Sequence, residues 1–359
     1  MDAFYSEVEI NEEILFSDFT VQYLEISKLS LAPTTIKEYE RVINKNLLPV
    51  FGKMRLNSIR PMHVQGFVNM LSGGYWGGNS KDGSLKPSSV IRYYAVLSSV
   101  FSCAYRLELI TSNPASKDKI RLPSLVGTQH TDILSKDQLM AMLIALDKEP
   151  LQFQVLIHLA IITGCRRGEL TSLQWNDVDI DNSIIYIKKS LYQLTGESAK
   201  VKSTKTGKNR TIAIPDYCSD MLVQLRTEQH IRKSKLGNLW NGQENNFLFT
   251  KADGSVMHPN TPTEFFNDFL NRHNLPHIKF HALRHTSATL MLLTGANIKQ
   301  VAARLGHSQL STTNRYVHAI QEVDRTLADS MGATVMDLKR NAKSAKPHND
   351  SNCFTSTQI

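Results

Sequence analysis

The chain has 359 residues, of which 41% are hydrophobic and 21% are charged, and its net charge at pH 7 is +8. This length predicts two or three domains, and the apolar content excludes a disordered chain. No apolar run approaches the roughly 18 residues that cross a bilayer, and no secretory signal or nucleotide-binding loop is present. The four cysteines lack the spacing of a metal or redox site, so we expect a cytoplasmic protein with reduced thiols and no bound metal.

The charges are distributed unevenly along the chain. Residues 1–20 contain six acidic side chains and no Lys or Arg, whereas residues 21–130 contain fourteen basic and six acidic side chains. A basic chain without a membrane segment favours nucleic acid as its partner, although a basic balance also arises for unrelated reasons. The charge therefore directs attention to side chains that bind phosphate.

The first half of the chain is predicted to be a small helical bundle over residues 14–112, preceded by an acidic segment at 1–13 and interrupted by a Gly-rich and Asn-rich loop at 75–84. Apolar residues at helical spacing and prolines at helix starts support this prediction. The expected helices are 14–29, one from Pro33 with Thr35 and Glu38 as a capping box, one entered at Arg60 and Pro61, and 85–110.

A linker without periodicity is predicted at 113–130, and the second half runs from 131 to 332 before a polar tail at 333–359 that is expected to be disordered. The elements expected in this half are a helix at 136–147 capped by Ser135 and Gln138, a helix at 151–163 ended by Gly164, strands within 175–215, and helices beyond 216. The predicted fold class is mainly α with a small β-sheet or hairpin.

The segment TGCRRGELTSLQW (163–175) places Arg166 at the start of a helix. A guanidinium suits phosphate because its planar fork donates two charge-assisted hydrogen bonds. Glu169, three residues later, can reach back and hold that arginine. The alternative is a solvated Arg–Glu pair on a helix surface.

Seven Lys or Arg side chains and one acidic side chain lie within residues 188–210. Strand-like runs on both sides of Thr206–Gly207 predict a tight turn, with Lys205 just before it. A lysine at the tip of such a hairpin could enter a groove and protonate a leaving oxygen. A flexible basic loop is the alternative, and Lys200, Lys202 and Lys208 leave the register open.

Two further motifs lie near the end of the chain. In KFHALRHTSATLML (279–292), His281 and Arg284 have the i, i+3 spacing that puts both on one side of a helix. In VAARLGHSQLSTTNRYVH (301–318), His307 follows a helix end and Tyr316 lies between basic neighbours that would favour its phenolate. Each motif alone also fits an ordinary helix surface or a packed aromatic side chain.

Taken in order with their flanking motifs TGCRRGEL, TKTGKNRTIAIP, HALRH and LGHSQLSTTNRYVH, these residues resemble the tyrosine recombinase family, also called the phage integrase family. The resemblance implies a helical, SAM-like core-binding domain at 14–112 and an α+β catalytic domain at 131–332. It assigns the phosphate clamp to Arg166 and Arg284, general base chemistry to His281, a phosphate hydrogen bond to His307, the general acid to Lys205, the nucleophile to Tyr316, and support of Arg166 to Glu169.

The resemblance further implies a site-specific recombinase that integrates or excises a phage or other mobile element through a 3′-phosphotyrosine. It needs neither ATP nor metal nor any other cofactor, since the phosphotyrosine conserves the bond energy. The implied partners are core or attachment sites on double-stranded DNA, three further copies in a tetramer, and accessory excision or DNA-bending factors at the nucleoid. A helix within 317–338 is a candidate for exchange between copies, whereas the short acidic head makes binding of arm-type sites doubtful.

Three alternatives remain open on the sequence. A Xer-like or inverting recombinase of the same family would carry the same residues. A type IB topoisomerase would nick and reseal DNA without pairing two sites. A catalytically inactive DNA-binding protein is disfavoured by the complete catalytic set. The DNA target sequence cannot be read from the chain, because the base-reading side chains are not identifiable.

Overall fold

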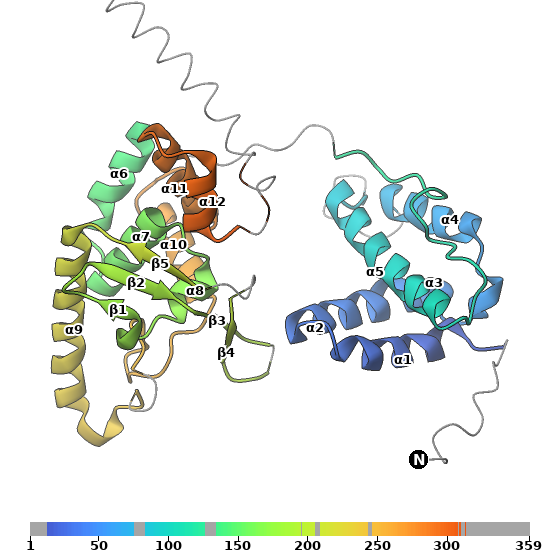
Figure 1. Cartoon of the computed structure of the whole chain (residues 1–359), viewed down its shortest axis with the longest axis horizontal. Coiled ribbons are helices and arrows are strands. Elements are labelled where there is room, and N and C mark those ends of the chain that lie inside the picture. Colours follow the sequence, from blue (N-terminus) through green and yellow to red (C-terminus); the bar gives the residue numbers. More distant parts are fainter. Residues whose placement is uncertain are drawn as a thin grey trace, which may run out of the picture. The chain divides into compact units, whose positions relative to one another are not determined.

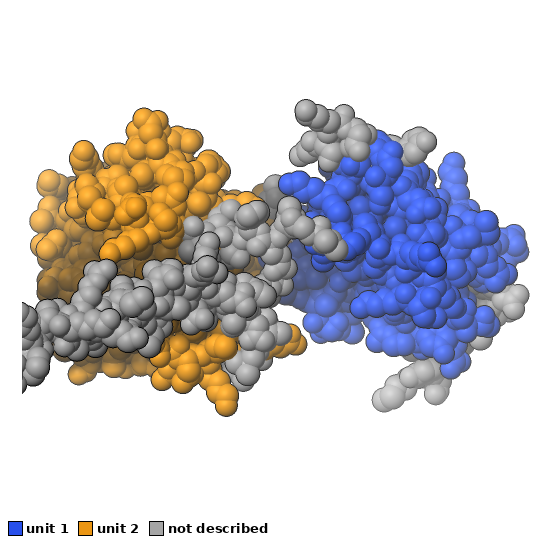
Figure 2. All heavy atoms as spheres, turned by 90° about the horizontal axis from the view of Figure 1, so that it is seen from above, with its two compact units in different colours: residues 1–130 blue, residues 131–359 orange. Residues whose placement is uncertain are grey.

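The computed structural model describes residues 13–74, 83–125, 134–194, 196–204, 209–242 and 246–307, together with Gln309 and Thr313. The chain forms two compact units, residues 1–130 and 131–359, which are coloured separately in Figure 2. Each unit has its own hydrophobic core. Within these described ranges, no helix combines the length and hydropathy that a membrane span requires.

The first unit is a helical bundle, as predicted. Its helices are α1 (Phe16–Lys28), α2 (Pro33–Val42), a π-helical turn (Ile43–Leu47), α3 (Leu48–Phe51), a 3-10 turn (Leu56–Ser58), α4 (Pro61–Ser72) and α5 (Pro87–Arg106) (Figure 1). Aromatic rings hold them together, since the ring of Phe16 lies 5.6 Å from that of Phe51 and 5.7 Å from that of Phe101. Tilted ring contacts of this kind add to the stabilisation from apolar burial.

The capping box predicted for α2 is wrong. Ala32 precedes the helix, and its side chain makes no cap hydrogen bond. Pro33 occupies the first turn, where its missing N–H costs nothing, so the helix starts before Thr35. Glu38 instead accepts hydrogen bonds of 2.9 and 2.8 Å from Arg41, one turn further on.

Part of the range predicted as a linker packs on the first unit. Tyr94 and Ser98 on α5 both donate hydrogen bonds of 2.8 Å to the carbonyl oxygen of Ala115. Ala115 and Ile120 are buried in the core of this unit. The chain therefore packs on the first unit as far as Ile120.

The second unit packs helices around a small antiparallel sheet, which confirms the predicted fold class. Its helices are α6 (Lys136–Leu146), α7 (Leu151–Thr163), α8 (Arg167–Thr171), α9 (Asp216–Leu236), α10 (Thr261–Arg272), α11 (Ala282–Leu293) and α12 (Ile298–Leu305), with 3-10 turns at Trp175–Asp177 and Gly237–Leu239. The cap predicted for α6 forms, because Ser135 and Gln138 exchange side-chain-to-backbone hydrogen bonds of 3.2 and 3.0 Å. The apolar α7 packs against α8, α9 and α11 and ends at Gly164, as expected.

The strands form two separate sheets. β1 (Val178–Asp179), β2 (Ile184–Ile187) and β5 (Arg210–Ala213) make one in the order β1-β2-β5, and β3 (Lys189–Tyr192) pairs with β4 (Lys200–Ser203) in the other. The hairpin predicted around Thr206–Gly207 is therefore wrong, since its two flanking strands belong to different sheets. The alternation of apolar and polar residues identified β4 and β5 but not the strands with which they pair. Ile212 of β5 is buried opposite Ile185 of β2, whereas β4 has no fully buried side chain.

Candidate active site

Arg166 is positioned by the end of one helix and the start of another. Gly164 ends α7 in the left-handed conformation, with φ 61°, and two residues later Arg166 precedes the first turn of α8. Its guanidinium donates to Glu169 Oε1 at 2.9 Å, while its backbone N–H donates to Glu169 Oε2, also at 2.9 Å. A third hydrogen bond of 3.3 Å reaches the carbonyl oxygen of Gly306. The side chain stays 25% exposed, so it can still meet a ligand.

The carboxylate of Glu169 is at the centre of the cluster. Its side chain is 1% exposed and also accepts two hydrogen bonds from Arg210, at 2.7 and 3.3 Å. Burial opposes the charged form, but Arg210 and Arg166 outweigh it and lower the pKa of Glu169. Glu169 is therefore an ionised, buried carboxylate that holds the guanidinium groups of Arg166 and Arg210 in place.

Arg284 joins two distant parts of the chain. It lies in the first turn of α11, is 3% exposed, and donates hydrogen bonds of 2.6 Å to the carbonyl oxygen of Gly164 and 2.8 Å to that of Leu305. These carbonyl groups lie two residues before Arg166 on one side and two residues before His307 on the other. One buried guanidinium therefore sets the distance between two segments that carry predicted site residues.

His281 and His307 lie next to these arginines. His281 directly precedes α11, and His307 follows the left-handed Gly306 and shares a 2.9 Å hydrogen bond with Thr313. Partial removal from water, together with the positive charges of Arg284 and Arg166, lowers the pKa of each ring to about 4. His281 is affected in this way although the residue as a whole is exposed. The histidines are neutral at pH 7 in a site whose field favours an anion.

The structure thus gathers four of the six predicted catalytic residues, together with Glu169. These are Arg166, His281, Arg284 and His307, which come from the start of α8, the start of α11 and the end of α12. Lys205 and Tyr316 lie outside the described residues, as do the predicted exchange helix at 317–338 and the tail at 333–359. Among the described residues, no cluster of His, Cys, Asp or Glu suits a metal ion.

Two side chains of the site are absent from the sequence-based prediction. Arg210 is one of seven basic residues in a basic stretch, and its pairing with Glu169 becomes visible only when β5 joins β2. His285 lies one helical turn after His281, with the two rings 5.2 Å apart. The i, i+4 spacing within HALRH was a signal that could have identified His285.

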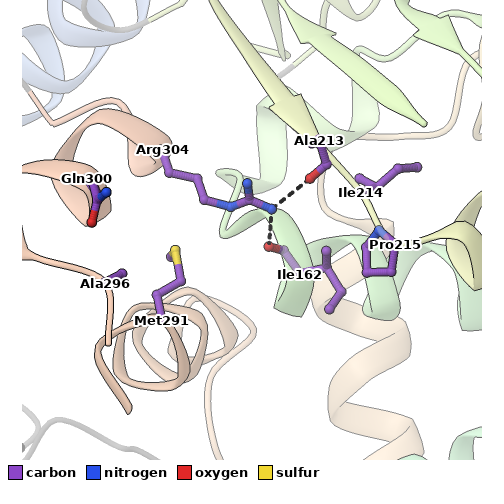
Figure 3. A pocket seen from close by; sticks show the side chains of 8 residues that line it. All are labelled: Ile162, Ala213, Ile214, Pro215, Met291, Ala296, Gln300 and Arg304. Carbon is purple, nitrogen blue, oxygen red and sulfur yellow. Dashed lines mark hydrogen bonds between the residues drawn. The ribbon is translucent and has the colours of Figure 1, made fainter. Parts of the chain in front are cut away.

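A groove lies beside this cluster on the second unit (Figure 3). Arg304 crosses it and donates hydrogen bonds to the carbonyl oxygens of Ile162 and Ala213, at 3.2 and 2.8 Å. Met291, Ala296 and Gln300 line it. The lining is mostly apolar and includes none of the four gathered residues, so the groove suits a chain segment better than a phosphate.

Replacing Gly164 with alanine is expected to destabilise the second unit. The added Cβ would lie 2.3 Å from Leu305 Cδ2 and 3.0 Å from Ser287 Oγ, at a φ that L residues rarely adopt. We expect a loss of about 3 kcal/mol in the free energy of unfolding, measured by urea denaturation. Gly196 is the matched control: it also has positive φ, but nothing lies within 4 Å of its added Cβ. Gly196→Ala should cost only about 1 kcal/mol, and equal losses in the two variants would contradict the steric argument.

Comparison with known sequences shows two matching family patterns. The phage integrase family matches residues 132–322, and the N-terminal SAM-like domain of phage integrases matches residues 15–72. A XerC-like tyrosine recombinase of Caldanaerobacter subterraneus subsp. tengcongensis is 29% identical over 327 residues, which cover 86% of this chain and 80% of that protein.

Solved structures share the fold. The Tn1549 transposon integrase in complex with a circular intermediate DNA has a TM-score of 0.68 and 19% identity, covering 86% of this chain and 99% of that chain. A lambda integrase tetramer bound to a Holliday junction has a TM-score of 0.62 and 17% identity, covering 85% of this chain and 78% of that chain. At these identities the likeness establishes the common fold.

Proposed function

Because the chain belongs to the phage integrase family of tyrosine recombinases, which cut and rejoin DNA, we propose that it recombines double-stranded DNA at specific sites through a 3′-phosphotyrosine on Tyr316. The observation that carries this proposal is the cluster of two arginines and two histidines beside the buried carboxylate of Glu169. Such a cluster can hold one phosphodiester and stabilise the negative charge that develops during its cleavage.

The proposed reaction has two steps, cleavage of one DNA strand and its rejoining to another. The phenol oxygen of Tyr316 attacks phosphorus and gives its proton to His281, while the bond to the 5′ oxygen breaks and Lys205 protonates that oxygen. The product is a 3′-phosphotyrosine and a free 5′-hydroxyl. A 5′-hydroxyl from a second DNA strand then gives its proton to Lys205 and attacks the phosphotyrosine. The bond to Tyr316 breaks, its phenol oxygen takes back the proton from His281, and a phosphodiester is restored. Fixed donors on Arg166 and Arg284 neutralise the phosphate oxygens in both steps.

The proposed biological role is integration or excision of a phage or other mobile element. The Tn1549 integrase complex with circular intermediate DNA supports it by likeness of fold. The helical first unit would hold the core site, with DNA-bending or excision factors as further partners at the nucleoid. Resolution of chromosome dimers is the second candidate, favoured by the XerC-like relative.

We further propose that four copies assemble on two DNA sites by exchanging a C-terminal segment. Val317, Ile320, Val323 and Leu327 have the spacing of one helix face, and the apolar groove crossed by Arg304 (Figure 3) offers a matching surface. A chain ending at Tyr316 should still bind a single DNA site but fail to assemble as four copies on a Holliday junction, as measured by sedimentation. Assembly of the shortened chain would refute the exchange.

Covalent capture on genomic DNA of the source organism tests the proposed function. The protein is incubated with nicked fragments, denatured, and the attached strand is sequenced. We expect protein on the 3′ end of one defined sequence. A site at the boundary of a mobile element supports integration, whereas one at a chromosomal resolution site supports the second candidate. Absence of any covalent complex would reject both.

Lys205→Ala is expected to slow cleavage by about 10² to 10⁴-fold on an ordinary phosphodiester, because the departing oxygen loses its acid. A 5′-bridging phosphorothioate has a better leaving group and should restore the rate. Lys200 is the control for register: it is exposed and pairs with Glu197 at 2.6 Å, so Lys200→Ala should change the rate less than about fivefold. Absence of recovery with the phosphorothioate would remove the acid role from Lys205.

Binding of DNA is expected to take up protons below pH 6.5. In the free protein the pKa values of His281 and His307 are lowered to about 4, and a bound phosphate raises them by adding negative charge. The bound state then holds more protons, so affinity rises as pH falls from 7 to 5. The folded state, by contrast, loses stability over this range, because the unfolded chain protonates first.

Calorimetry at pH 5.5 in two buffers of different ionisation enthalpy measures this uptake. His158 serves as the control, since burial also lowers its pKa but it faces Tyr217 rather than the cluster. His158→Gln should leave the uptake unchanged, whereas His281→Gln combined with His307→Gln should remove it. Equal uptake in all variants would contradict the assignment.

A further inference from the structure

The site contains one arginine to which neither the motifs nor the proposed mechanism gives a role. Arg210 begins β5, and its side chain is only 9% exposed. Besides the two hydrogen bonds to Glu169, it donates from Nε to the carbonyl oxygen of Arg304 at 2.9 Å and from Nη2 to Cys165 Sγ at 3.4 Å. A buried guanidinium with this many partners has little freedom to move, because its β-strand is also fixed by pairing with β2.

The contacts of Arg210 reach the segments that carry the phosphate-binding side chains. Through Glu169 it reaches Arg166, which donates to the same two carboxylate oxygens. Through the carbonyl of Arg304 it holds the last turn of α12, just before His307. Its guanidinium also packs against Gly306, where an added Cβ would lie 3.0 Å from Nη1.

The positive charge of Arg210 affects how Arg166 can bind a phosphate. If Glu169 had Arg166 as its sole partner, the pair would be neutral and the guanidinium would be drawn toward the carboxylate. With Arg210 present, the carboxylate is already compensated, so the charge of Arg166 remains available to a phosphate. Arg166, Arg210 and Arg284 against Glu169 leave a net charge of +2 in the described cluster. This matches the two negative charges of a phosphodiester during in-line displacement.

We propose that Arg210 is a positioning residue of the cleavage reaction, which compensates Glu169 so that Arg166 faces the scissile phosphate and which holds the end of α12 in register with it. The inference rests on the proposed function.

Single-turnover cleavage of the nicked duplex obtained by covalent capture tests the proposal. Arg210→Met keeps the volume but removes the charge, and we expect it to slow formation of the covalent complex at least about 100-fold while changing affinity for the duplex less than threefold. Arg210→Lys keeps the charge and should recover most of the rate. Cleavage by Arg210→Met at close to the wild-type rate would overturn the proposal.

A double variant separates positioning from simple support of the fold. If Arg210 acts by compensating Glu169, then Arg210→Met combined with Glu169→Gln should cleave at least about tenfold faster than Arg210→Met alone, because the uncompensated charge is gone. A rate equal to or below that of the single variant overturns the proposal. Arg272 is the matched control, since it forms a 2.8 Å ion pair with the 9% exposed Glu149 away from the cluster. Arg272→Met should lower stability without changing the cleavage rate.

The same cleavage assay distinguishes failure of the proposed recombination from failure of the role of Arg210. Failure of the wild-type chain to form any covalent complex rejects the proposed function. A wild-type complex with unaffected Arg210 variants rejects the positioning role alone. If Arg210→Met does not fold, the comparison of Arg210→Lys with the wild type decides: the lysine must retain the rate to within about tenfold, and a larger loss counts against charge compensation.

Discussion

Tyr316→Phe is expected to abolish the covalent complex with DNA, with a fall in cleavage rate of at least about 10⁴-fold, because phenylalanine has no oxygen with which to attack phosphorus. Binding to the same duplex should change little, since the described arginines and histidines that hold the phosphate remain. A nicked substrate analysed on a denaturing gel measures the adduct, and a gel-shift assay on the same duplex measures binding. Persistence of the adduct in this variant would transfer the nucleophile to another residue.

Arg284→Ala is expected to damage both stability and cleavage. The variant leaves the carbonyl oxygens of Gly164 and Leu305 without the buried donor that now lies at 2.6 and 2.8 Å. Each lost partner costs about 1–3 kcal/mol, so the midpoint of urea unfolding should fall clearly. Cleavage, measured at a temperature where the variant is folded, should fall at least about 10³-fold, because one of the two phosphate-clamping charges is lost.

The control for Arg284→Ala is Arg272→Ala. Arg272 pairs with the carboxylate of Glu149, its side chain is 49% exposed, and it lies outside the cluster. Its loss should lower stability, because the partner Glu149 is only 9% exposed, and should leave the cleavage rate within about threefold of wild type. A loss of cleavage in the Arg272 variant comparable with that of Arg284→Ala would show that the effect reports general destabilisation.

Local features of the chain were predictable from sequence because their partners lie within a few residues. The capping pair Ser135 and Gln138 and the bond from Arg166 to Glu169 each join residues three positions apart. The end of α7 depends on the backbone freedom of Gly164 alone. Local patterns also failed where a stronger local effect competed: Pro33 set the start of α2 and displaced the capping box expected at Thr35.

Long-range partners were not predictable from one sequence. Strand alternation identified β4 and β5, but it does not encode which neighbour each strand joins, so the hairpin around Thr206–Gly207 was predicted wrongly. The bond from Arg210 to Glu169 links residues 41 positions apart, and those from Arg284 to the carbonyl groups of Gly164 and Leu305 depend on the packing of α11 against α7 and α12. The motifs named most residues of the site, whereas the contacts that hold them together come from tertiary packing.

Identification of the residue that is joined to DNA tests the proposed nucleophile most directly. The covalent complex formed on a nicked duplex is digested with trypsin and nuclease, and the peptide that carries the nucleotide is sequenced by mass spectrometry. We expect a 3′-phosphate attached to the phenol oxygen of Tyr316. Attachment to any other residue, or to a 5′ end of the DNA, would contradict this expectation.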